Sequence, residues 1–258
     1  AARAGVTSAR LAEAGFAGAR AILEGPAGLF PVYYPQADIA AVTAAPSAPF
    51  RLHDVSFKPW PACRHAHPAI AAALRLRAEA PADDIAAVEV ATYRAAIDFC
   101  DDAAPESPHA ARFSLQHQVA VALLEGTPGL DHAEAAWRSA PRVRSLRARI
   151  ALASDPDHDA AFPGRMGATV TVRLHDGRAV RAEVGTAPGD PEDPLPPPAV
   201  RCKAFHNLAH GGVAPDAADR VLAAIEALDA APDLSALPAA LSVGLAAPAE
   251  RLREGAAP

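Results

Sequence analysis

The chain has 258 residues, of which 51% are hydrophobic, and this apolar content is enough for one large or two small domains. A net charge of −6 and a pI near 5.9 argue against nucleic acid or a membrane surface as the partner. The cysteines, Cys63, Cys100 and Cys202, are odd in number and lie far apart, which indicates a reducing compartment. The sequence shows neither an apolar run of membrane-spanning length nor a signal peptide, so we expect a cytoplasmic protein.

The first 50 residues are predicted to be helical and to end in a linker. Residues 1–25 are rich in alanine, with interruptions at Gly15 and Gly18, and an apolar cluster follows at residues 30–34. The prolines in residues 45–49 are typical of a linker between domains. The chain does not begin with methionine, which suggests a fragment of a longer protein.

The stretch with the most chemically capable side chains follows this linker. Alternation of polar and apolar residues predicts a short strand at Arg51–Phe57. Pro59 and Pro61 then fix two φ angles and keep the residues before them extended. A helix is predicted from Pro68 to Ala80, because proline suits the first helical turn and good helix formers follow it.

Several reactive side chains lie on the connection between this strand and this helix, namely Cys63, Arg64, His65 and His67. The free N–H groups at a helix N-terminus favour an anion, and Lys58 and Arg64 add positive charge nearby. The segment therefore predicts a corner that binds a carboxylate and holds an acid–base residue.

Two other interpretations of the same residues stay open. A lysine that follows a strand is equally often a solvated side chain. Arg64 could likewise form an ion pair with a carboxylate on the surface. Alternate spacing also allows Cys63, His65 and His67 to share one face and bind zinc. A zinc site needs a further ligand or water, and no second Cys/His pair lies at structural-zinc spacing, so we expect no metal.

The middle of the chain predicts a mixture of strands and helices. Ile85–Tyr93 has the pattern of a strand, and Phe113–Leu124 is an apolar helix in which Ser114 either caps the helix or faces a ligand. His117, one turn into this helix, is typical of a histidine satisfied by a neighbouring group. A later segment crowded with arginines predicts a solvated basic face, and its members are Arg138, Arg142, Arg144, Arg147 and Arg149.

The last third of the chain predicts a hairpin, a connector and two helices. Ala168–Leu174 and Ala179–Val184 are strands joined through an Asp-Gly turn. Gly189–Pro198 contains too many prolines for regular structure and is predicted to be a connector. Apolar spacing then predicts helices at Val200–Ala209 and Asp216–Leu228.

The segment from Lys58 to Ile70, Lys-Pro-aromatic-Pro-x-Cys-Arg-x-x-His-Pro-Ala-Ile, resembles the central motif of the MmgE/PrpD family. That family includes 2-methylcitrate dehydratase, cis-aconitate decarboxylase and iminodisuccinate epimerase. Three further stretches look like family landmarks in the same order: residues 111–126, residues 170–178, and residues 189–195 together with residues 203–205. The resemblance therefore spans almost the whole chain.

The resemblance implies a fold and a division into domains. It implies an α+β lid domain at residues 51–193, flanked by a helical tail and linker at residues 1–50 and by a returning helical segment at residues 194–258. Both flanks would belong to an all-α helical domain, most of which lies upstream of this chain. With their apolar helical faces they should pack beside each other, and no strand from either flank should join the sheet of the lid.

The resemblance also implies a chemistry: dehydration, decarboxylation or epimerisation of a small di- or tricarboxylate without a cofactor. It assigns catalytic roles to Lys58, His65, His67 and His117, and substrate-binding roles to Cys63, Arg64, Ser114 and Gln116. These residues should converge on one cleft. Cys63 stands where the decarboxylase branch carries a histidine, which disfavours decarboxylation. The pair Gln116 and His117 replaces the commoner Pro-Tyr, so a phenol donor is absent there.

Two functions from different classes follow from the missing helical half. The first is a lyase or isomerase that is complete only with an N-terminal helical half, as a homodimer or as a heteromer with a helical subunit. The second is a catalytically inactive lid fragment or partner subunit with a binding role. The sequence fixes neither the substrate nor the choice among the three reaction types.

Overall fold

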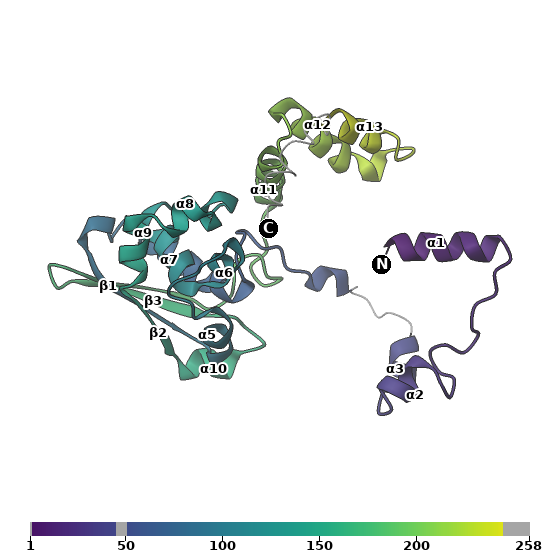
Figure 1. Cartoon of the computed structure of the whole chain (residues 1–258), viewed down its shortest axis with the longest axis horizontal. Coiled ribbons are helices and arrows are strands. Elements are labelled where there is room, and N and C mark those ends of the chain that lie inside the picture. Colours follow the sequence, from purple (N-terminus) through teal and green to yellow (C-terminus); the bar gives the residue numbers. More distant parts are fainter. Residues whose placement is uncertain (1, 45–50, 245–258) are drawn as a thin grey trace. The chain divides into compact units, whose positions relative to one another are not determined.

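The computed structural model describes residues 2–44 and 51–244, and these described residues divide after Arg51 into two compact units (Figure 1). The first unit holds three helices: α1 (Ala2–Glu13), α2 (Leu29–Tyr33) and α3 (Ile39–Thr43). The prediction of helix through residue 25 is therefore too long, because the chain turns at Gly15, which has a φ of +86°. The linker predicted at residues 45–49 lies outside the described residues.

The second unit is built on a sheet of four strands in the order β2-β1-β3-β4. The strands are β1 (Ile85–Thr92), β2 (Ile150–Ser154), β3 (Ala168–Leu174) and β4 (Ala179–Val184). β2 runs parallel to β1, and the other neighbours are antiparallel. The predicted strand at residues 85–93 and the predicted hairpin are confirmed, whereas β2, which is short and half-exposed, was not predicted. The unit is α+β, and each of these strands lies between residues 85 and 184, so the described flanks contribute none.

One face of the sheet is covered by helices and forms the core. Helix α4 (His67–Leu76) lies on β3 and β4, and α7 (Leu115–Leu124) packs on α4 and β2. Alternate residues of β1, including Val88 and Val90, point into this layer and are buried. The alanines of α4 are almost completely buried, and their small side chains allow the helix to approach the strands closely.

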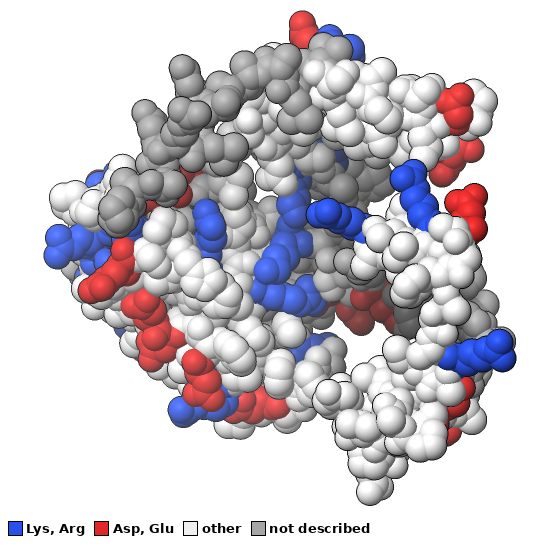
Figure 2. Space-filling view, turned by 45° about the vertical axis from the view of Figure 1, so that its right-hand side comes forward, with Lys and Arg blue, Asp and Glu red and all other residues white. Residues whose placement is uncertain are grey.

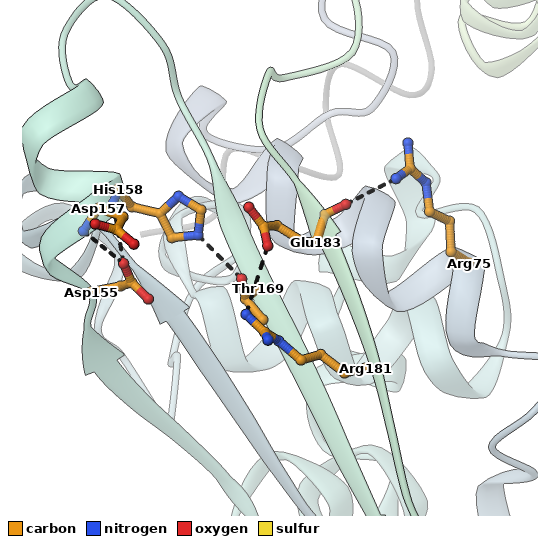
Figure 3. Close-up of polar contacts among 7 residues, drawn as sticks. All are labelled: Arg75, Asp155, Asp157, His158, Thr169, Arg181 and Glu183. Atoms are coloured by element: carbon orange, nitrogen blue, oxygen red, sulfur yellow. Dashed lines mark hydrogen bonds and ion pairs between the residues drawn. The ribbon is translucent and has the colours of Figure 1, made fainter.

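The opposite face of the sheet carries alanine, threonine and charged side chains. Figure 3 shows the polar contacts at one end of this face. His158 lies 3.2 Å through Nε2 from the hydroxyl of Thr169. The Asp155 carboxylate accepts from the backbone of the helix that carries His158, α10 (Pro156–Ala161). The Arg75 guanidinium reaches the main chain of β4 by donating to the Glu183 carbonyl over 3.0 Å. These contacts tie the β2–β3 connection and the edge strand β4 to the rest of the lid.

The segment before α4 is not a strand, contrary to the prediction. Arg51–Asp54 is a 3-10 helix (η1), and the chain then runs extended without joining the sheet. The Phe57 N–H donates to the Gly189 carbonyl over 2.8 Å, so the entry of the lid is bonded to the connector that leaves it. Gly189 has a φ of +88°, and a Cβ there would overlap the Phe57 carbonyl oxygen. We call this contact between the Phe57 and Gly189 segments the clasp.

The helices around the sheet begin and end at recognisable signals. Pro68 occupies the first turn of α4, as predicted, but α4 ends at Leu76 rather than at Ala80. The predicted helix at residues 113–124 is present as α7 but begins at Leu115, because Ser114 ends α6 and caps α7, one of the two roles expected for it. The remaining elements of this region are η2 (Arg64–Ala66), η3 (Ala82–Asp84), α5 (Arg94–Cys100), α6 (Pro108–Phe113), η4 (Leu130–Ala133), α8 (Ala135–Arg138) and α9 (Pro141–Arg147).

After the irregular connector, the chain returns to helices, as predicted. They are α11 (Pro197–His210), α12 (Pro215–Glu226), η5 (Leu228–Ala230) and α13 (Ala236–Gly244). Phe205 and Leu208 of α11 pack on a small cluster that includes Ala218 of α12. Figure 2 shows charged side chains in separate groups with broad uncharged areas between them. Among the described residues, no helix combines the length and apolarity that crossing a membrane requires.

Candidate functional site

A pocket of about 730 Å3 lies where the entry segment of the lid meets α11. Three parts of the chain form its walls: the segment from Lys58 to Pro61, the loop from Thr127 to Asp131, and the helix α11. We call it the lysine pocket. Its lining residues are Lys58, Pro59, Trp60, Pro61, Thr127, Pro128, Gly129, Leu130, Asp131, Lys203, His206, Asn207 and His210.

Both lysines of the chain line this pocket. The sequence contains 24 lysine and arginine residues, and only Lys58 and Lys203 are lysines, which leaves 22 arginines. They are 145 residues apart in sequence, yet Lys203 Nζ donates to the Lys58 carbonyl oxygen over 2.6 Å. This bond brings the ammonium group of α11 to the backbone of the segment before α4, where the chain bends at residues 59–62 and the Ala62 N–H donates to the Trp60 carbonyl over 2.9 Å.

The face of α11 that lines the pocket carries further titratable groups. Lys203, His206 and His210 follow at helical spacing, so they share one face of the helix. His210 Nδ1 lies 3.4 Å from the Asp131 carboxylate, and His206 is exposed. The sequence analysis missed this face as part of a site. Its signal was the spacing of three basic side chains on one helix, together with the scarcity of lysine.

His67 lies directly behind the pocket wall. Its ring contacts Trp60 at a centroid distance of 5.4 Å, and the residue is only 1% exposed. Burial, together with the charges of Lys58, Arg64 and Lys203, lowers the pKa of His67 to about 4, although a contact with the Ala62 carbonyl opposes this. At neutral pH His67 is therefore an uncharged support for Trp60 and not a cation.

Arg64 points to a different part of the lid. Its guanidinium forms an ion pair with Asp190, a carboxylate of the connector that is only 5% exposed. Both residues line a smaller cavity of about 280 Å3, beside Pro163 and Gly164. The pair reinforces the clasp between the entry segment and the connector.

His65 lies in an aromatic cluster against α5. Its Nδ1 is 2.7 Å from the Tyr93 hydroxyl, and its ring stacks on Phe99 with a centroid distance of 5.2 Å. Burial and the charge of Arg64 lower the pKa of His65. The pKa of Tyr93 is raised by burial and by the nearby Cys100 and Cys63, so its phenol is neutral.

Cys63 is buried next to this cluster. Its backbone N–H donates to the Arg112 carbonyl over 2.7 Å, and its thiol accepts a hydrogen bond from Cys100. That bond lowers the pKa of Cys63, with help from backbone N–H groups and the charge of Lys58, although burial opposes it. The same contact and burial raise the pKa of Cys100.

Ser114 and Gln116 act within the lid. The Ser114 hydroxyl accepts from the backbone N–H of His117 over 2.9 Å and donates to the Asp102 carbonyl. The Gln116 amide donates to Asp101 over 2.6 Å and accepts from the Asp102 backbone. The two side chains therefore fix the turn that follows α5.

His117 is fully buried and supports the loop of the lysine pocket. Its Nε2 donates to the His132 carbonyl over 2.8 Å, and its Nδ1 lies 3.4 Å from the Arg147 guanidinium. Burial, together with the charge of Arg147, lowers the pKa of His117 to about 4, although the bond to the His132 carbonyl opposes this. Since His132 follows Asp131, this histidine holds one wall of the pocket from behind.

The structure corrects the prediction of a solvated basic face. Arg147 is only 6% exposed, and Arg138 and Arg149 donate to backbone carbonyls of other elements. Only Arg142 and Arg144 of the five are exposed. The arginines of this segment mainly anchor loops.

The predicted site residues do not converge on one cleft within this chain. Lys58 lines the lysine pocket, and His67 and His117 lie behind its walls. Arg64 faces the smaller cavity with Asp190, and His65 and Cys63 face α5. In the described part of the chain, no group of three or more metal-ligating side chains lies close together.

The second unit is therefore α+β, and its pocket lies between the segment before α4 and the helix α11. The model of the MmgE/PrpD C-terminal domain matches residues 60–230, which is about two thirds of the chain. The chain belongs to the MmgE/PrpD family. No curated protein matches it.

Proposed function

We propose that this chain supplies the lid of a cofactor-independent lyase or isomerase that acts on a small di- or tricarboxylate. The observation that carries the proposal is the lysine pocket, in which the only two lysines of an arginine-rich chain come together. Cations at the edge of a pocket of this size bind a carboxylate more strongly than cations in open solvent, because water is partly excluded there. The Trp60 ring offers an apolar wall for the carbon skeleton.

In this proposal the two ammonium groups have different tasks. Lys58 is exposed and has no side-chain partner among the hydrogen bonds and ion pairs of the described residues, so it is available to hold a carboxylate or to deliver a proton. Lys203 is held at the Lys58 carbonyl and serves as a second, positioned cation. Proton removal from the carbon next to a carboxylate leaves a carbanion, whose charge these cations would stabilise.

The histidines fit roles of two kinds. His206 lies on the pocket wall and is the group of this chain best placed to exchange a proton with a bound acid. His67, His117 and His65 act through other groups, since each is bonded or stacked inside the lid. We therefore assign to them the positioning of Trp60, of the pocket loop and of the motif segment.

The complete enzyme would need an N-terminal helical half, in the same chain or in a partner. The helices α1–α3 support this, because their large apolar side chains are exposed in their own unit, among them Val32, Tyr33 and Tyr34. The alternative is a non-catalytic lid subunit that binds a partner through the same surface. Intact mass and sedimentation of the native protein distinguish the two, since only the enzyme requires a longer chain or a co-purifying helical subunit with turnover.

The scarcity of lysine allows a direct test of the pocket. An amine-reactive reagent such as trinitrobenzenesulfonate should label both lysines, and citrate, used as a tricarboxylate probe, should protect them. The matched control is Arg173→Lys, which places a third lysine on the open face of the sheet and should be labelled with or without citrate. Labelling of Lys58 and Lys203 that citrate leaves unchanged would remove the basis of the proposed site.

In the complete enzyme, Lys58→Ala should lower turnover by roughly 10²–10⁴-fold, the usual effect of losing one acid–base group. The fold should survive, because Lys58 is exposed and contributes little to the core. Near wild-type turnover with intact folding would contradict a catalytic role for Lys58.

A further inference from the structure

The cysteines of the chain differ sharply in their surroundings. Cys63 and Cys100 are both free, buried, and members of one core cluster, whereas Cys202 is exposed on α11. The two thiols interact, and η2, which follows Cys63, packs against α5. They come from segments 37 residues apart: Cys63 directly precedes η2, and Cys100 ends α5.

The contact between these segments does not rest on the cysteines alone. His65, two residues after Cys63, stacks on Phe99, which directly precedes Cys100, with ring planes 9° apart. His65 also bonds to Tyr93 at the start of α5. Several side chains thus hold the two cysteine-bearing segments against each other, and both thiols are buried in the core cluster that these segments share.

We propose that Cys63 and Cys100 are a redox-active pair that a hydroperoxide converts into an intramolecular disulfide. The Cys63 thiolate attacks the peroxide oxygen, the O–O bond breaks, and the leaving alkoxide or hydroxide takes up a proton. The Cys63 sulfenic acid then reacts with the Cys100 sulfur, forming the S–S bond and releasing water. The two thiols lose two electrons and two protons in all, and the peroxide is reduced to water and an alcohol, or to two waters.

The roles of the two thiols follow from their environment. Cys63 is the attacking group, because the hydrogen bond from Cys100 and the charge of Lys58 both favour its thiolate. Cys100 is the resolving group, because burial and the bond to Cys63 keep it protonated until the sulfenic acid forms. Cys63 also retains slight exposure, 8% against 1% for Cys100, so it meets the oxidant first.

The disulfide would join the motif segment to α5. Cys63 is five residues from Lys58, and the same segment carries Trp60, so the bond would fix the pocket wall in one position. The reaction itself does not depend on the proposed function, since it needs only the two thiols and a peroxide.

The test uses the whole chain treated with hydrogen peroxide and digested with trypsin. Cys63 falls in the peptide of residues 52–64 and Cys100 in the peptide of residues 95–112, so a disulfide links two distinct peptides. We expect this linked pair, the loss of two of the three thiols, and full recovery with dithiothreitol. Cys202→Ser should give the same linked pair, and Cys63→Ala and Cys100→Ala should each abolish it.

Three results would overturn the proposal. The first is over-oxidation of Cys63 to the sulfinic acid while Cys100 stays a free thiol. The second is a disulfide that includes Cys202. The third is a wild-type chain in which both buried thiols persist at peroxide levels that fully oxidise Cys202, a comparison that needs no variant to fold.

Discussion

Two groups of polar residues in this molecule differ in their burial and in their bonding. Ser114, Gln116 and His117 on α7 are buried, and each side chain is bonded to the main chain or to a neighbour inside the lid. Lys58 and His206 at the lysine pocket are exposed, and their charged or polar ends face a cavity.

The difference separates structural residues from residues available for chemistry. A buried histidine whose nitrogens are both engaged loses its hydrogen bonds if it takes part in proton transfer, and that loss destabilises the fold. An exposed lysine at a cavity exchanges only water for a ligand. Histidine thus supports the frame at α7 and offers an exposed ring at the pocket on α11.

Among the buried and bonded residues, loss of the Arg64 ion pair should have the largest effect on the free energy of unfolding. Arg64→Ala leaves the buried Asp190 carboxylate without its partner, and we expect unfolding to become easier by about 3 kcal/mol. The matched control is Arg94→Ala, which removes an exposed ion pair with Asp98 and should cost less than about 0.5 kcal/mol. Urea unfolding measures both, and equal losses would show that Asp190 is not effectively buried.

Replacement of His117 should have the second largest effect on the free energy of unfolding. His117→Ala removes the donor to the His132 carbonyl and leaves a small cavity, so we expect a loss of about 2–3 kcal/mol in unfolding free energy. His206→Ala, its exposed counterpart, should change stability by less than about 0.5 kcal/mol. Equal unfolding free energies for the two variants in urea would contradict the assignment of His117 as a structural residue and His206 as a pocket residue.

The pH dependence of stability tests the same histidine. The folded pKa of His117 is about 4, below the value of 6.5 for a free histidine, so the unfolded state binds a proton first as the pH falls. The stability from neutral His117 is complete above about pH 6.5 and is lost between there and about pH 4, by roughly 3 kcal/mol.

The variant His117→Gln, which keeps a donor but does not titrate, should lack this part of the acid loss. Unfolding midpoints at a series of pH values measure it. His67 has the same lowered pKa and stays in both proteins, so only the difference between the two profiles counts. Identical profiles would show that His117 is accessible to protons in the folded lid.

Ser114 should show the smallest of these effects. Ser114→Ala removes the cap of α7 and a bond to the Asp102 carbonyl, for an expected loss of about 1–2 kcal/mol. Ser107→Ala removes the exposed cap of the short helix α6 and should cost about 0.5 kcal/mol. Thermal unfolding of the two variants measures both losses. A larger loss for Ser107→Ala than for Ser114→Ala would contradict the expectation that a buried cap contributes more stability than an exposed one.

Local signals in the sequence predicted much of the fold. Strand alternation and an Asp-Gly turn specify β3 and β4, and Pro68 marks the first turn of α4. The extended but unpaired segment before Lys58 misled the strand prediction, because alternation does not reveal whether a neighbouring strand exists. The break at Ser114 was also hidden, because apolar spacing continues across it.

The site was harder to predict than the fold. Lys58 was identified from its motif, but Lys203 joins it only through a long-range contact that no local pattern encodes. The partners of Arg64 and His117, Asp190 and the His132 carbonyl, are likewise distant in sequence or lie on the main chain. Their assignment depends on burial, which sequence patterns indicate for apolar side chains better than for polar ones.

The clasp has a mechanical consequence. Because Phe57 and Gly189 are bonded to each other, the lid is a closed loop whose two ends leave at one point. A pull on the flanking chain should load this single joint first, and the sheet should stay intact until it opens. Lys58 is the residue after Phe57, so any change in the clasp would be transmitted directly to the wall of the lysine pocket.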